Sequence, residues 1–435
     1  MTDSPRLQAP MLEGAVEQLL PGGEALVRTD QGVVLVANGV PGDVLALEPR
    51  GRRRGAERAR IRGCIEASKL RVPAPCPAAQ DCGGCALQYV NVSAHSDIKS
   101  DWVSNVLGKY LDAQGEFLPV QEKPEFGMRR RARWHTGQDT DGGLLGFHSR
   151  RSHRVVRASS CAVAHPDMDA LRLAIEDMLP TMVESVRMLR LHDGMHVVFE
   201  CGDSPVPDAS LFEAVLAAVA DAPLTMQPWL RAGPVIRPLT RPVQELHDRL
   251  PAGDAWVDLA VGPEDFVQGH AAGNEAILRQ IQAWAGSPRR IADLFCGIGN
   301  LSLPMAAACG AQVVGADVAE SSIRAARANA RRLGIQAEFE ALNLFEGVGL
   351  KHNAGEHYVG ADVLLLDPPR KGAKAICRDM GRLLPEKIIM VNCDIAAGAR
   401  DAETLQQQGY CMQSLRALDI FPFSGHVEAM SLWTR

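Results

Sequence analysis

Cys393 lies where an apolar run, KIIMVN at 387–392, gives way to a helix-like segment that begins DIAAGARD. Cysteine is often a buried packing residue, but a thiolate is also a nucleophile with which enzymes form covalent intermediates. The start of the following helix and Arg370 are two features that could lower the pKa of this thiol. The neighbourhood of Cys393 therefore decides between packing and catalysis.

Cys76, Cys82 and Cys85 form a C-x5-C-x2-C pattern in a segment rich in proline and glycine. Three thiols within ten residues, with two glycines between the last pair, suit metal ligation better than packing. Their spacing does not distinguish zinc from an iron–sulfur cluster.

A glycine-containing stretch, DLFCGIGNLSL at 293–303, follows a predicted strand and opens a helix. Glycines there let the backbone approach a ligand closely, and Asp317, twenty residues after Gly297, can accept the ribose hydroxyls of a nucleoside cofactor. Asp367 ends another apolar run in LLLDPPRKG. Since parallel strands present their carboxyl ends at one edge, we expect Gly297, Asp317, Asp367 and Cys393 to converge.

The elements that must position these residues form a βαβ pattern from about residue 263 onward. RRIADLF, AQVVGAD, ADVLLLD and KIIMVN are short apolar runs, and helix-like segments separate them. Such runs are typical of buried parallel strands. Residues 12–66 instead alternate apolar and polar positions between glycine and proline turns, which predicts a small barrel of the oligonucleotide-binding type.

The formal net charge is −6 over 435 residues, but basic residues gather in runs at 50–63, 128–135 and 150–157. Local basic patches favour a nucleic-acid partner more than net charge opposes it. No apolar run is long enough to span a membrane, and the first ten residues show no signal pattern. We expect a cytoplasmic monomer whose eleven cysteines stay reduced.

DLFCGIGN resembles the S-adenosylmethionine loop of class I methyltransferases. Together with DPPR and the cysteine strand, it resembles the RNA uracil-C5 methyltransferases, and is most similar to the iron–sulfur enzymes that methylate large-subunit (23S) ribosomal RNA. The resemblance covers almost the whole chain. It implies an α/β class I (Rossmann-like) methyltransferase domain at 263–435, a TRAM-like RNA-binding barrel at 1–66, and a central α+β domain at 67–262 that carries the cluster.

The resemblance also implies a role for individual residues. Cys393 falls on the catalytic nucleophile and Glu428 on the catalytic base, whereas His426 is interpreted as structural or as a support for the residues that react. Cys161 supplies the fourth ligand of a [4Fe–4S] cluster with Cys76, Cys82 and Cys85. The positions that bind S-adenosylmethionine are Gln268, Phe295, Gly297, Asn300, Asp317, Asn343 and Asp367.

In the implied reaction a thiolate attacks C6 of uracil, C5 takes the methyl group, and a base removes the C5 proton. The uridine must be unpaired and flipped out of its stack. Alternatives are a tRNA uridine methyltransferase, a catalytically silent RNA-binding protein on the same scaffold, and an amino-group methyltransferase, whose DPPY motif DPPR resembles.

The chain departs from the family at two places near the site. NCDI replaces the common SCNP, and His270 replaces an asparagine in FVQGH. Asp394 puts a negative charge next to Cys393, and a like charge would raise the pKa of the thiol.

Overall fold

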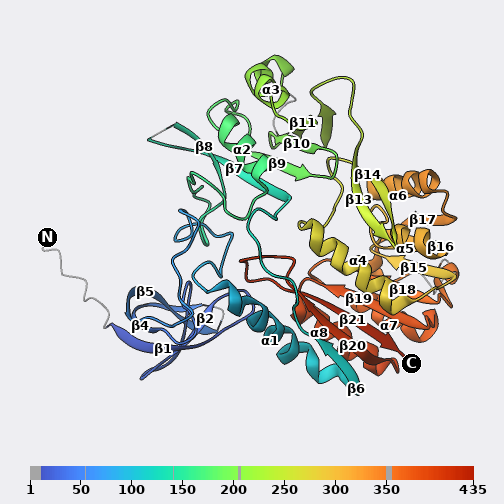
Figure 1. Ribbon diagram of the computed structural model, residues 1–435, viewed down its shortest axis with the longest axis horizontal. Coiled ribbons are helices and arrows are strands. Elements are labelled where there is room, and N and C mark those ends of the chain that lie inside the picture. Colours follow the sequence, from blue (N-terminus) through green and yellow to red (C-terminus); the bar gives the residue numbers. More distant parts are fainter. Residues whose placement is uncertain (1–10, 54, 141, 204–206, 349–354) are drawn as a thin grey trace, which may run out of the picture.

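The computed structural model describes residues 11–53, 55–140, 142–203, 207–348 and 355–435. The first ten residues, for which the sequence predicts no signal peptide, lie outside the described residues. Arg54 of the basic run at 50–63 also lies outside them. Within the described ranges, no helix is long and apolar enough to cross a membrane. The chain builds a barrel, a central sheet and a large eight-stranded sheet, which lie around a common centre (Figure 1).

Five strands near the N-terminus close into a barrel in the order β1-β2-β3-β5-β4. The first half of β1 buries every second side chain, as expected for a strand with one face in a core. A five-stranded barrel is thus confirmed where the alternation predicts one. Its strands are β1 (Leu12–Leu19), β2 (Ala25–Thr29), β3 (Gly32–Val36), β4 (Val44–Arg53) and β5 (Ala56–Glu66).

The central sheet has six strands in the order β12-β11-β10-β9-β7-β8. One face carries apolar side chains such as Trp134, Met188 and Phe199, which form a core with two helices, α2 (Pro166–Ile175) and α3 (Glu213–Ala220). The other face is largely polar and looks toward the common centre. The strands are β7 (Arg131–Asp139), β8 (Gly142–Gly146), β9 (Ser185–Arg190), β10 (Met195–Glu200), β11 (Met226–Ala232) and β12 (Val235–Pro238).

The largest sheet has the order β17-β16-β15-β18-β19-β21-β20-β6, and its strands β15 to β19 are parallel. The four predicted apolar runs form β15, β16, β18 and β19, each almost entirely buried. The strands are β15 (Arg290–Leu294), β16 (Gln312–Asp317), β17 (Ala337–Ala341), β18 (Val363–Leu366), β19 (Lys387–Asn392), β20 (Cys411–Leu418) and β21 (Glu428–Thr434).

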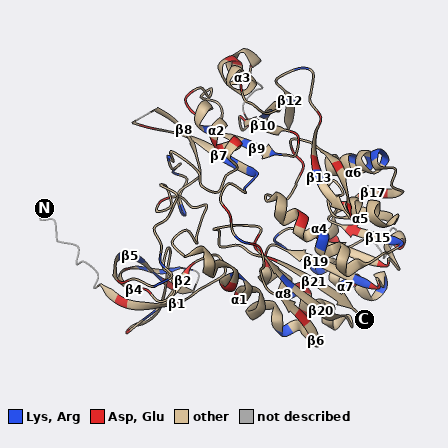
Figure 2. Cartoon of the chain, viewed as in Figure 1, with Lys and Arg blue, Asp and Glu red and all other residues tan. Residues whose placement is uncertain are grey.

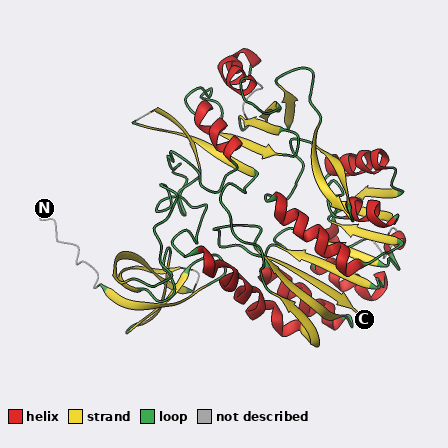
Figure 3. Cartoon of the chain, in the orientation of Figure 1, coloured by secondary structure: helices red, strands yellow, loops and turns green. Residues whose placement is uncertain are grey.

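Helices cover both faces of this sheet (Figure 3), as expected for a class I methyltransferase fold. They are α4 (Ala271–Ala285), α5 (Ser302–Cys309), α6 (Glu320–Leu333), α7 (Lys374–Leu383) and α8 (Ile395–Gln407). The hairpin of β13 (Leu246–Ala252) and β14 (Ala255–Val261) packs on α4, α5 and α6.

The eighth strand of this sheet, β6 (Leu111–Leu118), comes from the part of the chain that the sequence assigns to the central domain. It pairs in parallel with β20 at the sheet edge. The preceding helix α1 (His95–Leu107) is tied down by Lys99, whose ammonium donates to Asp419 Oδ1 at 2.5 Å and to the carbonyl of Phe421. The link between barrel and central sheet is therefore built into the methyltransferase domain.

Candidate active site

A cavity of about 2140 Å³ lies where the barrel, the central sheet and the large sheet meet. Residues at the ends of β15, β16, β18 and β19 and at the start of β21 line it, because parallel strands present their carboxyl ends at one edge. The structure brings eight of the nine predicted catalytic and cofactor-binding residues to this one cavity: Gln268, Phe295, Gly297, Asn300, Asp317, Asp367, Cys393 and Glu428.

The glycine loop after β15 has a backbone that is held away from ordinary strand geometry. Phe295 has a φ of 74°, which is costly for a residue with a side chain, and Gly297 has a φ of 53°. The N–H groups of Phe295 and Cys296 both donate to the carbonyl of Ala316, which fixes the turn. No heavy atom lies within 4 Å of where a Cβ of Gly297 would stand, so this stretch of backbone is open to the cavity.

Asp317 ends β16 beside this loop. Its Oδ2 accepts from the N–H of Gly297 at 3.0 Å, and its Oδ1 accepts from Ala319. A carboxylate oriented in this way keeps further lone pairs for a ligand. Exposed apolar side chains, Val318 and Phe345, stand next to it on the same cavity. The arrangement suits a nucleoside, whose sugar is polar and whose base is flat and apolar on its faces.

Three carboxyl groups line the inner wall. Asp293 and Glu428 are each about 1% exposed, and Asp367 is half-buried directly after β18. Burial raises the pKa of Asp293 to about 7, and burial together with the charge of Asp293 raises the pKa of Asp367 to about 7. Burial, and then the charge of Asp367, raises the pKa of Glu428 well above its ordinary value. The wall thus carries acid groups that lack a cation.

Hydrogen bonds satisfy these acids only in part. Ser302 Oγ donates to Asp293 Oδ2 at 2.5 Å, and Gln268 Nε2 donates to Asp367 Oδ2 at 3.2 Å. Asp293 Oδ1 and Glu428 Oε1 are buried and have no hydrogen-bond partner among the described residues. A cationic ligand with hydrogen-bond donors would fit such a wall.

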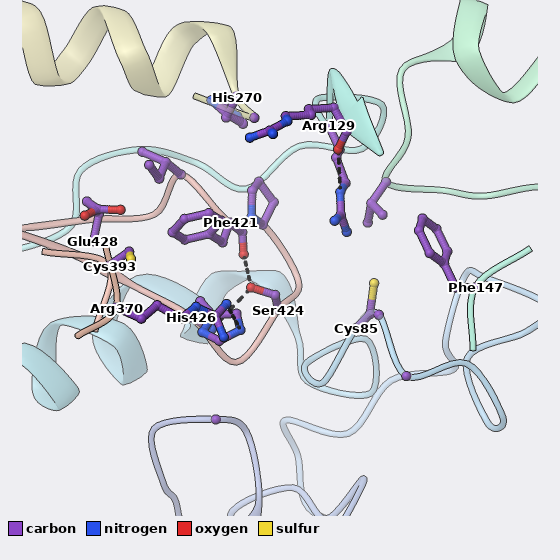
Figure 4. Close-up of a pocket in the computed structure, with 18 of the residues that line it drawn as sticks. Cys85, Arg129, Phe147, His270, Arg370, Cys393, Phe421, Ser424, His426 and Glu428 are labelled. Atoms are coloured by element: carbon purple, nitrogen blue, oxygen red, sulfur yellow. Dashed lines mark hydrogen bonds between the residues drawn. The ribbon is translucent and has the colours of Figure 1, made fainter. Parts of the chain in front are cut away.

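Cys393 and Glu428 lie side by side because of the strand register. The last paired residues of β19 and β21 are Asn392 and Ala429, so the next position on each strand brings the thiol beside the carboxyl group. Figure 4 shows both side chains at this edge, with Arg370 close by. Arg370 Nη2 in turn lies 3.4 Å from Nε2 of His426.

The thiol of Cys393 is not activated in the structure as the sequence suggests. Burial, Glu428 and Asp367 raise its pKa to about 11, and these effects outweigh the opposing effect of Arg370. Arg370 lowers this pKa, as the sequence suggests, but the net shift is upward. The raised pKa expected from Asp394 has a different cause, because the acids that raise it are Glu428 and Asp367.

Asp394 and His270 both cap helices. Asp394 Oδ1 accepts from the N–H of Ala397 at 2.8 Å and so caps α8. His270 Nδ1 accepts from the N–H of Gly273 at 2.7 Å and caps α4. Asparagine, which the family commonly has at both positions, is a good helix N-cap. Asp394 and His270 therefore keep the capping role that asparagine could fill.

Asn343 is the predicted cofactor residue that does not line the cavity as described. Its amide donates to Glu346 Oε1, and its Oδ1 accepts from the N–H of Phe345, so it holds the turn that presents Phe345.

Asp293 is the site residue that sequence reasoning missed. The signal was present, because an acid stands inside the apolar run of β15, where burial of a charge is costly.

The four predicted ligand cysteines, Cys76, Cys82, Cys85 and Cys161, line one small cavity with Gln88. Burial raises the pKa of the Cys82 and Cys161 thiols. Burial also raises the pKa of the Cys85 thiol, to about 11. As they stand, no three His, Cys, Asp or Glu side chains in the described part of the chain are close enough together to hold a metal ion. The convergence of the four cysteines is therefore observed, whereas a metal geometry is not.

Comparisons with known proteins agree with this fold. A methyltransferase-domain family model matches residues 291–386. The 23S rRNA (uracil(1939)-C(5))-methyltransferase RlmD of Aromatoleum aromaticum is 33% identical over 448 residues, 97% of this chain and 99% of that protein. RlmD of Pseudomonas aeruginosa is 31% identical over 96% of this chain and 93% of its own length.

Among solved structures, the Pyrococcus abyssi tRNA (uracil-54, C5)-methyltransferase in complex with S-adenosyl-L-homocysteine matches with a TM-score of 0.73. The two chains are 22% identical, and the match covers 97% of this chain and 99% of the other. At this level of identity the similarity establishes the fold.

Proposed function

This chain belongs to the RNA uracil-C5 methyltransferases, and from this premise we propose that it methylates C5 of a uridine in 23S rRNA. Its relatives are named for uracil 1939, which we take as the target here. The observation that carries the proposal is the meeting, on one cavity, of a thiol, a buried carboxyl group beside it and an open glycine loop.

The donor proposed is S-adenosylmethionine, and the residues present fit it. The glycine loop and Asp317 would hold the nucleoside part, and the wall of Asp293 and Asp367 would face the charged part. When bound, this cofactor supplies a methyl group on a positively charged sulfur. A cation there would offset the acids that raise the pKa of Cys393, so more of the thiol would ionise in the complex.

Cys393 would act on the uracil ring. Its thiolate forms the Sγ–C6 bond, and the electron pair of the C5=C6 double bond moves into the ring carbonyl system, so that C5 becomes nucleophilic. After C5 has gained the methyl group, Glu428 removes the remaining C5 proton, C5=C6 re-forms, and Sγ leaves as thiolate. Glu428 suits this step because its high pKa makes it a competent base when ionised.

A covalent trap tests this proposal. RNA containing 5-fluorouracil has no C5 proton to remove, so the protein with cofactor should form a stable protein–RNA adduct, and Cys393→Ala should not. Glu428→Gln should accumulate adduct with ordinary RNA, because its elimination step lacks a base. RNA binding without adduct or methyl transfer would point to the silent scaffold, and full activity of Cys393→Ala would point to an amino-group methyltransferase.

We also propose that Cys76, Cys82, Cys85 and Cys161 hold a [4Fe–4S] cluster. The support is their convergence on one small cavity, because four half-buried thiols placed together suit metal ligation. Protein purified without oxygen should be brown and contain about four iron and four sulfide per chain. Colourless protein with stoichiometric zinc would contradict the cluster and leave the methyltransferase proposal intact.

A further inference from the structure

The polar face of the central sheet carries a row of arginines that starts beside the active site. Arg131 and Arg133 occupy alternate positions of β7, so their side chains share this face. Arg187 on β9 is paired directly opposite Arg133. Figure 2 shows basic residues on both strands. Like charges placed directly opposite each other destabilise a sheet, so this row is not explained by folding.

Two of these arginines share one acid, and Glu264, the other acid that acts on Arg187, is itself paired with Arg231. Glu200 accepts from Arg133 Nη2 at 3.0 Å and lies 3.8 Å from Arg187, so one carboxylate serves two guanidinium groups. Nε and Nη2 of Arg187 are buried and have no hydrogen-bond partner within the described residues. Burial and the neighbouring arginines, Arg187 first among them, lower the pKa of Arg131. An anion on this face would relieve these repulsions.

Aromatic rings stand at both ends of the row. Phe266 is 52% exposed, and the Arg131 guanidinium lies 4.8 Å from the centre of its ring. Phe266 is two residues from Gln268, which contacts Asp367 in the active site. At the other end, His135 of β7 stacks on His148 with ring centres 3.9 Å apart and an angle of 16° between the rings.

His135, His148 and His153 form a cluster of neighbouring rings. Burial lowers the pKa of His135, and so do His148, Arg133 and His153, whereas Glu200 opposes them. The rings of His153 and His148 meet edge-on, with ring centres 5.6 Å apart. The stacked rings offer a flat surface, and the arginines offer charge. Proteins that hold single-stranded nucleic acid combine these two features.

Phe266, Arg131, His135 and His148 all line the active-site cavity. We propose that this face binds the unpaired RNA strand that flanks the target uridine, with one base stacked on His148 and the backbone phosphates on Arg131, Arg133 and Arg187. Positions 131 to 135 span roughly 14 Å along β7, which is enough for a few nucleotides. The inference rests on the proposed function, because it takes RNA as the substrate.

Equilibrium binding to a single-stranded oligoribonucleotide of about twelve nucleotides, measured by fluorescence anisotropy over a range of salt concentrations, tests the two parts separately. Arg133→Gln should weaken binding and reduce the slope of log K against log salt by about 0.7, the value for one lost phosphate contact on a single strand. Arg249→Gln is the matched control. Arg249 is 49% exposed and Arg133 is 51% exposed, and each pairs with a carboxylate on another strand, but Arg249 lies on β13, outside the central sheet that carries the arginine row.

His148→Ala should raise Kd by about five- to tenfold with an unchanged salt slope, because stacking a base does not release counterions. His148→Phe should restore binding, and His192→Ala, at an exposed histidine outside the cavity lining, should have no effect. Thermal melting of each variant identifies loss of folding, and recovery in His148→Phe shows that the ring itself matters.

Two results would overturn the inference: an Arg133→Gln slope equal to that of the wild-type protein, or an equal loss for His148→Ala on an oligonucleotide that lacks bases. The second result would mean a general anion surface, such as one for an acidic protein. Binding is measured without cofactor, so a protein that shows these effects but transfers no methyl group would disprove the proposed function alone. A protein that methylates RNA with no such effects would disprove only this inference.

Discussion

Changing Glu428 to glutamine should make the Cys393 thiol more acidic while stopping turnover. Glu428 is the first of the two acids that, after burial, raise the pKa of Cys393 to about 11 from the ordinary 9.0. The difference of two pKa units corresponds to about 2.7 kcal/mol against the thiolate. At pH 9 a thiol with a pKa of 11 is roughly 1% ionised, and one with a pKa of 9 is half ionised. Because burial and Asp367 remain, the increase in thiolate in Glu428→Gln should stay below about fiftyfold.

The assay is the rate of alkylation of Cys393 by iodoacetamide between pH 7 and 11, followed by mass spectrometry of the peptide that contains it. Asp394→Asn is a matched control, because it makes the same change of carboxylate to amide one residue from the thiol. Asparagine can still cap α8, so this variant should keep both fold and thiol pKa. The reasoning is refuted if Asp394→Asn lowers the thiol pKa as much as Glu428→Gln does, or if Glu428→Gln raises it.

Three further predictions concern buried charges. Lys99→Met should lower the free energy of unfolding by about 3–5 kcal/mol in chemical denaturation, because it leaves Asp419 buried without its cation; adding Asp419→Asn should recover part of the loss, and additive losses would contradict the pairing. Asp293, with a pKa of about 7 in the fold against 3.8 ordinarily, keeps its proton as the pH rises. The contribution of Asp293 to stability is therefore greatest below pH 4 and lost by about pH 7. The affinity for the cofactor should rise between pH 6 and 8, when the carboxylate forms. Titration calorimetry should find a flatter dependence of cofactor affinity on pH in Asp293→Asn. Arg130→Met should raise the KM for cofactor more than it changes kcat, because Arg130, paired with Asp248, holds the carbonyl of Gln268; a change in kcat alone would contradict this positioning role.

The sequence predicts which residues lie at the edge of the large sheet, because buried strands require apolar residue types that are visible in the sequence. Parallel strands covered on both faces need continuous apolar runs, so the residue after each run lies at the common edge. This reasoning places Asp317, Asp367 and Cys393 together, as the structure does. It fails for β6, whose sequence LDAQGEFL has no such run. This strand is held at an edge by pairing with β20, about 300 residues later in the chain, and such a distant contact leaves no local pattern.

Side-chain direction is the second thing that residue type does not reveal. Asp394 follows Cys393 directly, and from sequence it looks like the charge nearest to the thiol. In the structure its carboxylate turns back to the N–H of Ala397, whereas Glu428, 35 positions away in the chain, faces the thiol. The arginine row has the same character. The alternation of Arg129, Arg131 and Arg133 is visible in the sequence, but their partner Arg187 is supplied by strand pairing.

The direction of β21 explains why the base comes from the start of a strand when the other site residues come from strand ends. This strand is inserted between β19 and β20 and runs antiparallel to both. Its first residue therefore reaches the edge where the parallel strands finish. Neighbouring residues on a strand face opposite sides, so Ala429 cannot replace Glu428 at the thiol, and a slip of one residue in the pairing would turn the carboxylate away from Cys393. The pair of thiol and base is thus fixed by sheet register, and the loop at 419–427 must return the chain so that Ala429 pairs with Asn392.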